Sequence, residues 1–273
     1  RTGYYQDFGT LEQLAMAFRD GFVYSGQYSA FRQRRHGNSS RACPAHQFVV
    51  CSQNHDQVGN RLLGERLSHL VSFEQLKLAA SAVLLSPCIP LLFMGEEYAE
   101  TAPFQYFVSH SDPALIEAVR QGRQEEFKSF AWPGEPVDPQ DDATSRRCRL
   151  NLALRKQGHH HGLRTFYKAL IRLRKQRPAL ASLDQETMEV RGDESKQLLW
   201  IRRWREQDEV LLVFNFSDAV HAATFPVPRG AWVKQLDSAD HRWKGSGATV
   251  PDTFDSNGAA MLRMAPHACV VFA

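Results

Sequence analysis

Two short apolar runs that enclose a helical pattern constrain the fold of this chain most strongly. Residues 48–51 (FVVC) and 89–93 (IPLLF) have the composition of strands that are buried on both faces. Between them, Ser72 and Gln75 form a predicted capping box, and apolar residues then recur at helical spacing until Pro87. A strand, a helix and a second strand predict a right-handed βαβ unit with parallel strands.

A polar cluster follows each predicted strand. Residues 54–57 (NHDQ) follow the first run, and Glu96 and Glu97 follow the second. Because the carboxyl ends of parallel strands meet at one edge, both clusters should share a face, as active-site residues of α/β barrels do. Taken alone, His55 and Asp56 would be a strand end that continues into a polar loop. Together, the two clusters favour a functional site, and the lack of a G-x-G-x-x-G or P-loop pattern removes a nucleotide-binding interpretation.

The remaining N-terminal part offers three weaker patterns. A capping box at Thr10 predicts a first helix that ends near Gly21. Residues 25–46 and 98–160 lack periodicity and read mostly as loops, the second rich in aromatic residues and prolines. A further helix is predicted over residues 163–177, with the basic side chains near its end on a solvated face.

The pattern changes near residue 185, where helical spacing gives way to short strands separated by Gly, Pro, Asp and Ser. Seven such strands without intervening helices predict a small antiparallel β-sandwich. We therefore expect one domain over residues 1–180 and an all-β domain over residues 181–273. The predicted strands are 187–190, 198–204, 209–216, 222–227, 232–236, 259–264 and 268–272.

Composition excludes several classes of protein. Apolar residues make up 43% and charged residues 23%, and the net charge of +3 gives no reason to expect nucleic acid. No apolar run approaches the roughly 20 residues that span a membrane. The five cysteines are odd in number and never form a C-x-x-C pair, so we expect reduced thiols in a cytoplasmic protein. The adjacent His159, His160 and His161 cannot all face one ion from a helix, and we expect neither a metal nor a cofactor.

Several segments carry a family resemblance. SQNHDQVGNR (52–61) resembles the NHD motif at the seventh barrel strand of the α-amylase superfamily of glycoside hydrolases, and PLLFMGEEYAE (90–100) resembles the end of its eighth strand. With GYYQDFG (3–9), PFQYF (103–107), EAVRQGRQEEF (117–127) and FYKALIRLRK (166–175), they resemble one branch, the maltooligosyltrehalose trehalohydrolases. The resemblance implies an α/β fold: the C-terminal part of a (β/α)8 TIM barrel, followed by the β-sandwich.

The resemblance also implies roles for residues. Asp56 matches the third catalytic carboxylate, a transition-state stabiliser that accepts hydrogen bonds from the sugar at the cleavage point. His55 would donate to the same sugar. Weaker candidates for substrate binding near the trehalose end are Gln57, Arg61, Glu96 and Glu97. For the two glutamates, an alternative is that they hold the mouth of the barrel together.

The departure from the family pattern is equally informative. A nucleophile and a general acid are required, and neither the G-F-R-x-D-type motif nor the acid glutamate of the family occurs in this sequence. We therefore expect the C-terminal portion of an enzyme that hydrolyses the α-1,4 bond next to the trehalose end of maltooligosyltrehalose. The isolated chain should be inactive, with the N-terminal half of the enzyme as its partner. Alternatives are another α-amylase-type enzyme, debranching or branching, or a non-catalytic glucan-binding half-barrel.

Overall fold

The computed structural model describes residues 3–128 and 134–273, and the predicted aromatic loop residues 130 and 132 lie outside them. Its helices are α1 (Leu11–Asp20), α2 (His55–Gly59), α3 (Leu67–Leu70), α4 (Phe73–Leu84), α5 (Pro113–Lys128), α6 (Asp142–Arg147), α7 (Gly158–Gln176) and α8 (Pro178–Ala181). Its strands are β1 (Ser25–Ser29), β2 (Arg34–Gly37), β3 (Val49–Val50), β4 (Ile89–Pro90), β5 (Met188–Asp193), β6 (Leu198–Arg205), β7 (Asp208–Asn215), β8 (His221–Asp237), β9 (Thr253–Met264) and β10 (Ala268–Phe272). Short 3-10 helices include η3 (Glu96–Tyr98).

Both predicted capping boxes are present. The Thr10 hydroxyl accepts from the Gln13 backbone at the start of α1, and Ser72 does the same for Gln75 at the start of α4. Helix α1 ends at Gly21 with φ 88°, a left-handed conformation that favours glycine. A Cβ added there would lie 2.7 Å from the Phe48 ring, so the close approach of the chain also requires glycine.

The predicted βαβ unit is confirmed in its pairing. Strands β3 and β4 are parallel, with Val49 opposite Ile89 and Val50 opposite Pro90, and α4 lies between them in sequence. The prediction that both runs are buried on both faces is wrong. Val49 is 60% exposed and Ile89 and Leu91 are about 40% exposed. The reason is that, within the described residues, no further strand pairs with β3 or β4.

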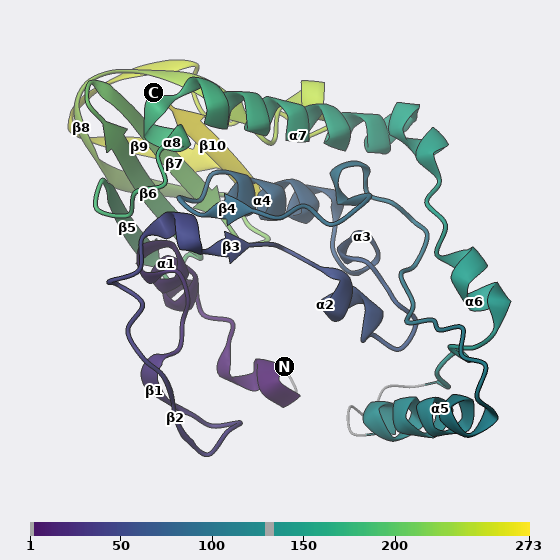
Figure 1. Ribbon diagram of the computed structural model, residues 1–273. Coiled ribbons are helices and arrows are strands. Elements are labelled where there is room, and N and C mark those ends of the chain that lie inside the picture. The colour runs from purple at the N-terminus through teal and green to yellow at the C-terminus, as the bar shows by residue number, and fades with distance from the viewer. Residues whose placement is uncertain (1–2, 129–133) are drawn as a thin grey trace.

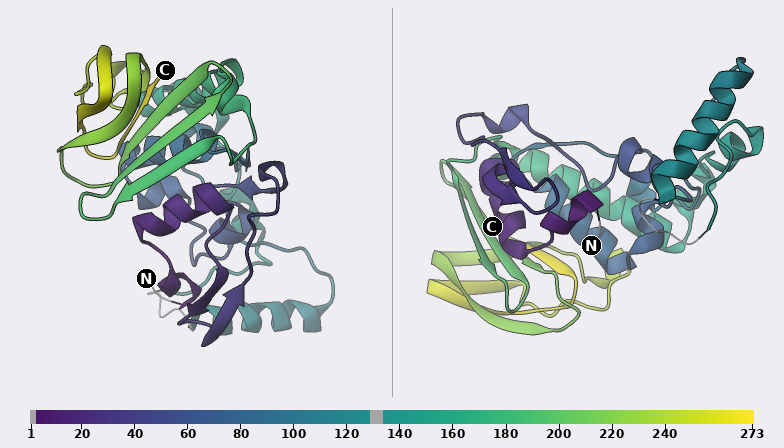
Figure 2. Two further views of the ribbon diagram at one scale, coloured as in Figure 1. Left: turned by 90° about the vertical axis from the view of Figure 1, so that its left-hand side faces the viewer. Right: turned by 90° about the horizontal axis from the view of Figure 1, so that it is seen from below.

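The C-terminal strands form one antiparallel sheet in the order β5-β6-β7-β10-β8-β9. It has six strands rather than the predicted seven, because β8 continues through an irregularity between Val227 and Gly230. Leu199 and Ile201 on β6 face the helices, whereas Leu198 and Trp200 on the same strand pack against residues of β8 and β9. The sheet therefore folds over itself as in a sandwich, and Figure 2 shows the β8–β9 ribbon as a separate layer.

The helices and the sheet share one hydrophobic core. Helices α1, α4, α7 and α8 cover one face of the sheet, with α7 running along the top of the molecule in Figure 1. The buried Arg203 of β6 donates to the Leu85 carbonyl (2.9 Å) across this contact, and burial lowers its pKa to about 9. The buried Lys77 of α4 donates to the Ser238 carbonyl (2.5 Å) beyond β8. These contacts join the two parts firmly.

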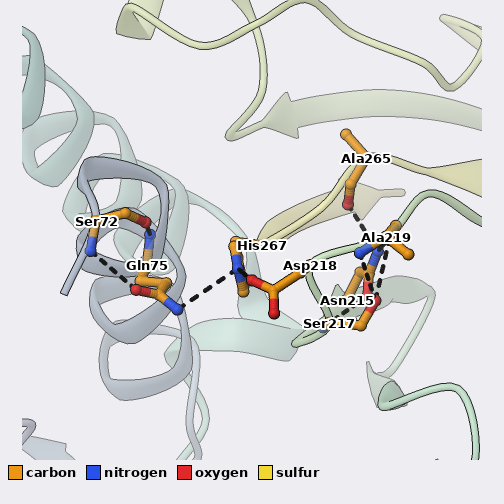
Figure 3. A network of polar contacts seen from close by, with 8 residues as sticks. All are labelled: Ser72, Gln75, Asn215, Ser217, Asp218, Ala219, Ala265 and His267. Atoms are coloured by element: carbon orange, nitrogen blue, oxygen red, sulfur yellow. Dashed lines mark hydrogen bonds and ion pairs between the residues drawn. The ribbon is translucent and has the colours of Figure 1, made fainter.

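A polar network joins the same two parts at the start of α4 (Figure 3). Gln75, whose side chain completes the capping box, lies with its Nε2 3.5 Å from Nε2 of His267. The same His267 nitrogen lies 2.7 Å from an oxygen of the exposed Asp218. The helix cap is therefore held by the loops of the β-sheet as well as by its own sequence.

Three predictions for the N-terminal part are wrong. Residues 25–37 form a β1–β2 hairpin rather than a loop, and residues 113–128 form α5, a largely polar helix.

The third wrong prediction is that the basic side chains near the end of α7 are solvated. Arg174 donates to the carbonyls of Leu84, Ser86 and Cys88 at 2.6–2.7 Å, and Arg177 pairs with Asp208. Arg174 thereby satisfies carbonyl groups left over at the end of α4.

Candidate functional site

The candidate site begins where β3 leads into the short helix α2. Asn54 caps this helix by accepting from the Gln57 backbone (3.0 Å), which places His55 and Asp56 in its first turn. Nε2 of His55 lies 3.3 Å from Oδ1 of Asp56, and both side chains are more than 70% exposed. The pair therefore does not carry the burial cost that the strand pattern suggested. In this chain it presents an accessible carboxylate beside an imidazole.

Gln57, which follows this pair on α2, and Arg61 line a pocket of about 230 Å³, whereas His55 and Asp56 are not among its lining residues. The other lining residues come from the N-terminal segment, the chain after β3, α2 and the chain near α3: Tyr5, Ser52, Gln53, Val58, Glu65, Leu67 and Leu70. Nη2 of Arg61 lies 3.3 Å from Oε1 of Glu65. The pocket thus combines an apolar floor with amide, guanidinium and carboxylate groups, which suits a polyhydroxylated ligand.

Glu96 and Glu97 follow β4 on η3 but differ from Asp56 in environment. Glu96 is buried, and it accepts from the Phe93 backbone N–H (3.1 Å) and from the Tyr167 hydroxyl on α7 (3.3 Å). Burial raises the pKa of Glu96 to about 7, although these hydrogen bonds oppose the shift. Glu97 is partly exposed. Glu96 is therefore enclosed by its contact with α7, whereas Asp56 on α2 is exposed.

Two buried charged residues near the site gave no sequence signal. Glu100 is fully buried and accepts from the Tyr98 hydroxyl (2.8 Å) and from the backbone of Ala102 and Asn151 (2.9 and 2.7 Å). Burial alone would raise the pKa of Glu100, but these donors hold it below its ordinary value. The buried Arg66 donates to the carbonyls of Met94 and Ala102, both at 2.7 Å. Together they fix the chain that leaves β4. Neither Arg66 nor Glu100 belongs to a helical or strand pattern of apolar residues. Glu100 could have been singled out only because it ends the GEEYAE segment.

Within residues 3–128 and 134–273, no group of three or more His, Cys, Asp or Glu side chains is arranged to hold a metal ion. Over the same residues, none of the helices has the length and apolar character that crossing a membrane requires.

Comparison with known proteins identifies the class of the C-terminal part first. Residues 189–273 match the family model of the alpha amylase C-terminal all-beta domain. In fold, the whole chain is similar to the 1.4 Å crystal structure of a Salmonella typhimurium protein named as a candidate alpha amylase. That comparison has a TM-score of 0.77 and 30% identity, and it covers 100% of this chain and 43% of the other. The predicted all-β domain of the α-amylase type is confirmed.

The particular relatives are malto-oligosyltrehalose trehalohydrolases. The chain is 46% identical over 221 residues to the enzyme of that name from Rhizobium sp., covering 80% of this chain and 36% of the relative. It is 46% identical over 222 residues to the one from Brevibacterium helvolum (80% and 37%) and 46% identical over 176 residues to the one from Saccharolobus solfataricus (64% and 29%). The predicted resemblance to this family is confirmed, and the chain spans about a third of the length of these relatives.

Proposed function

We propose that this chain is part of a glycoside hydrolase of α-glucan and trehalose metabolism, which releases trehalose from maltooligosyltrehalose. The reaction would be hydrolysis of the α-1,4 bond next to the trehalose end. The observation that carries the proposal is the identity of 38–46% to relatives named for this activity. The substrate would be maltooligosyltrehalose or a related α-glucan, without a cofactor, and neither nucleic acid nor a membrane would be a partner.

Asp56 would act as the transition-state stabiliser. Its carboxylate would accept hydrogen bonds from sugar hydroxyls, and these bonds strengthen as the ring flattens toward an oxocarbenium ion. His55 would donate to the same sugar, and Gln57 and Arg61 would contact the trehalose end from the pocket of about 230 Å³. Exposure of the His55–Asp56 pair in this chain is consistent with a substrate-facing position.

The nucleophile and the general acid would come from a part of the parent protein outside this sequence. In this proposal, β3 and β4 are neighbouring strands of a (β/α)8 barrel. Support comes from their parallel pairing and from the exposed apolar side chains of Val49, Ile89 and Leu92, which further barrel strands would cover. Glu96 and Glu97 would then stabilise the mouth of the barrel rather than bind substrate.

Two further proposals concern organisation and location. We propose that the boundary between the barrel part and the all-β domain lies at residues 180 and 181, within the short helix α8 that precedes the first strand of the sheet at Met188. We also propose a cytoplasmic protein. All five cysteines are free, and three of them (Cys88, Cys148 and Cys269) are buried thiols, as expected in a reducing compartment.

The test is Asp56→Asn in the complete enzyme, with Asp142→Asn as the matched control. Asp142 is also an exposed aspartate in the first turn of a short helix, but it lies on α6. Asp56→Asn should lower kcat for trehalose release about 10³-fold, which corresponds to about 4 kcal/mol of transition-state stabilisation. The control should retain its kcat. A normal kcat with a raised KM would reduce Asp56 to a binding group and refute its catalytic role.

A further inference from the structure

Helix α2 carries the candidate catalytic pair and is too short to hold its own position. It has five residues, His55–Gly59, and isolated helices of this length are unstable in water. Its orientation must therefore be set by contacts at its two ends. At the first end, Asn54 caps the helix. The contacts at the other end come from a segment that is distant in sequence.

That segment is α5, which projects from the rest of the molecule in Figure 2. Arg123 on α5 donates from Nη2 to the Gly59 carbonyl (3.0 Å) and from Nη1 to Oδ1 of Asn60 (2.9 Å). Gly59 is the last residue of α2, and Asn60 caps its C-terminal end. Because a guanidinium group is planar, two such bonds fix the direction of the acceptors as well as their distance.

Arg123 is itself held firmly. Its guanidinium carbon lies 4.5 Å from the ring centre of Phe127 and 5.0 Å from that of Tyr106, and Nη1 lies 2.7 Å from Oε2 of Glu126. Its side chain is only 14% exposed, although α5 is mostly solvated. A cation between two rings and beside a carboxylate has little freedom to turn away from α2.

The path from Arg123 to the carboxylate is short. The backbone N–H of Asn60 donates to the carbonyl of Asp56 (3.1 Å), so one residue receives the Arg123 contact and also holds the Asp56 backbone. On the buried side, Gly59 lies against the ring of Phe104. Displacement of the Asn60 side chain would therefore shift the first turn of α2, where His55 and Asp56 lie.

We propose that Arg123 is a positioning residue for the glycosidase reaction, which aligns Asp56 by clamping the C-terminal end of α2. The inference rests on the proposed function. It gives a role to the polar helix α5, which carries the EAVRQGRQEEF segment. Arg123 does not touch the substrate in this scheme, and its effect reaches the sugar only through α2.

The experiment uses the complete enzyme with Arg123→Met and Arg123→Lys, and Arg120→Met as the matched control. Arg120 lies one turn away on α5 but pairs with Asp138, so its loss removes the same charge without touching α2. A misplacement of about 1 Å can reduce a rate about 100-fold, so Arg123→Met should lower kcat by about that factor with KM changed less than about threefold. Arg123→Lys should recover part of the loss, and Arg120→Met should behave as wild type.

A second variant protects the test against misfolding. Asn60→Ala removes one of the two acceptors of Arg123 at an exposed position. Like Arg123→Met it should lower kcat, but it should leave Tm unchanged. In the double variant the two losses should not add, because both break one contact. Equal kcat in Arg123→Met and Arg120→Met, additive losses, or a raised KM alone would overturn the positioning role. If Asp56→Asn also has normal kcat, the catalytic role of Asp56 in the proposed function fails as well. If only Asp56→Asn is impaired, the positioning role alone fails.

Discussion

Replacement of Glu96 by glutamine should change how the stability of this protein depends on pH. Glu96 is 5% exposed, and its pKa is raised by burial from an ordinary value of 4.5 to about 7. Below pH 4.5 the carboxyl group is protonated in both the folded and the unfolded state. Between pH 4.5 and 7 only the folded state keeps the proton, so the free energy of unfolding falls as pH rises through this window. The difference between a pKa of about 7 and one of 4.5, at 1.36 kcal/mol for each pH unit, gives a loss of about 3 kcal/mol.

The Glu96→Gln variant cannot ionise at this position, so it should lack this part of the pH dependence. Its amide oxygen can still accept from the Phe93 backbone or from the Tyr167 hydroxyl, so the hydrogen bonds of the site are largely kept. Thermal unfolding of both proteins at intervals from pH 4 to 8 would measure the difference. The variant should gain about 3 kcal/mol relative to wild type across this range. A constant difference between the two proteins would show that Glu96 has the same pKa in the folded and the unfolded state, and would refute the assignment of a desolvated carboxyl group.

Two other predictions concern the packing of α7 on the end of α4 and the packing of the helices on the sheet. Arg174→Met should lower the free energy of unfolding by about 3 kcal/mol because it leaves three carbonyl groups at and just after the end of α4 without their donor. The exposed Arg172→Met is the control, and equal thermal midpoints would contradict the capping role. Limited proteolysis should cut first in residues 182–187 and leave residues 188–273 intact but still bound to the helices through the shared core. Separation of the pieces on gel filtration would show that this core does not hold them.

The elements that could be predicted are those whose signal is local. The capping boxes at Thr10 and Ser72 are read from residues three apart, and both helices begin where the sequence placed them. The parallel pairing of β3 and β4 also follows from local patterns and the rule for βαβ units. In contrast, most of α5 is exposed, and its placement depends on contacts such as that of Arg123 with Asn60, which lies 63 positions away.

For the candidate site, the position of the residues along the chain could be predicted, but their burial could not. The order of residues near β3 places His55 and Asp56 at the carboxyl end of a strand, and the structure confirms that position. Whether a carboxylate is buried depends on what packs over it, and this information is absent from the local sequence. Glu96 and Asp56 follow neighbouring strands, yet Glu96 is enclosed through its contact with Tyr167 on α7, and Asp56 is exposed.

This difference bears on how Asp56 could stabilise a transition state. At 4 Å, two unit charges interact by about 1 kcal/mol in water and about 4 kcal/mol at the lower effective dielectric near a covered protein site. Because its side chain is 74% exposed, Asp56 in this chain would interact with a developing charge at the lower, water-like end of these energies. Substrate and the remaining parts of the parent enzyme would have to exclude water from α2 before the carboxylate could contribute fully. Alignment of α2 by Arg123 would then matter most at that step, because a fixed carboxylate needs no reorganisation as positive charge develops on the sugar.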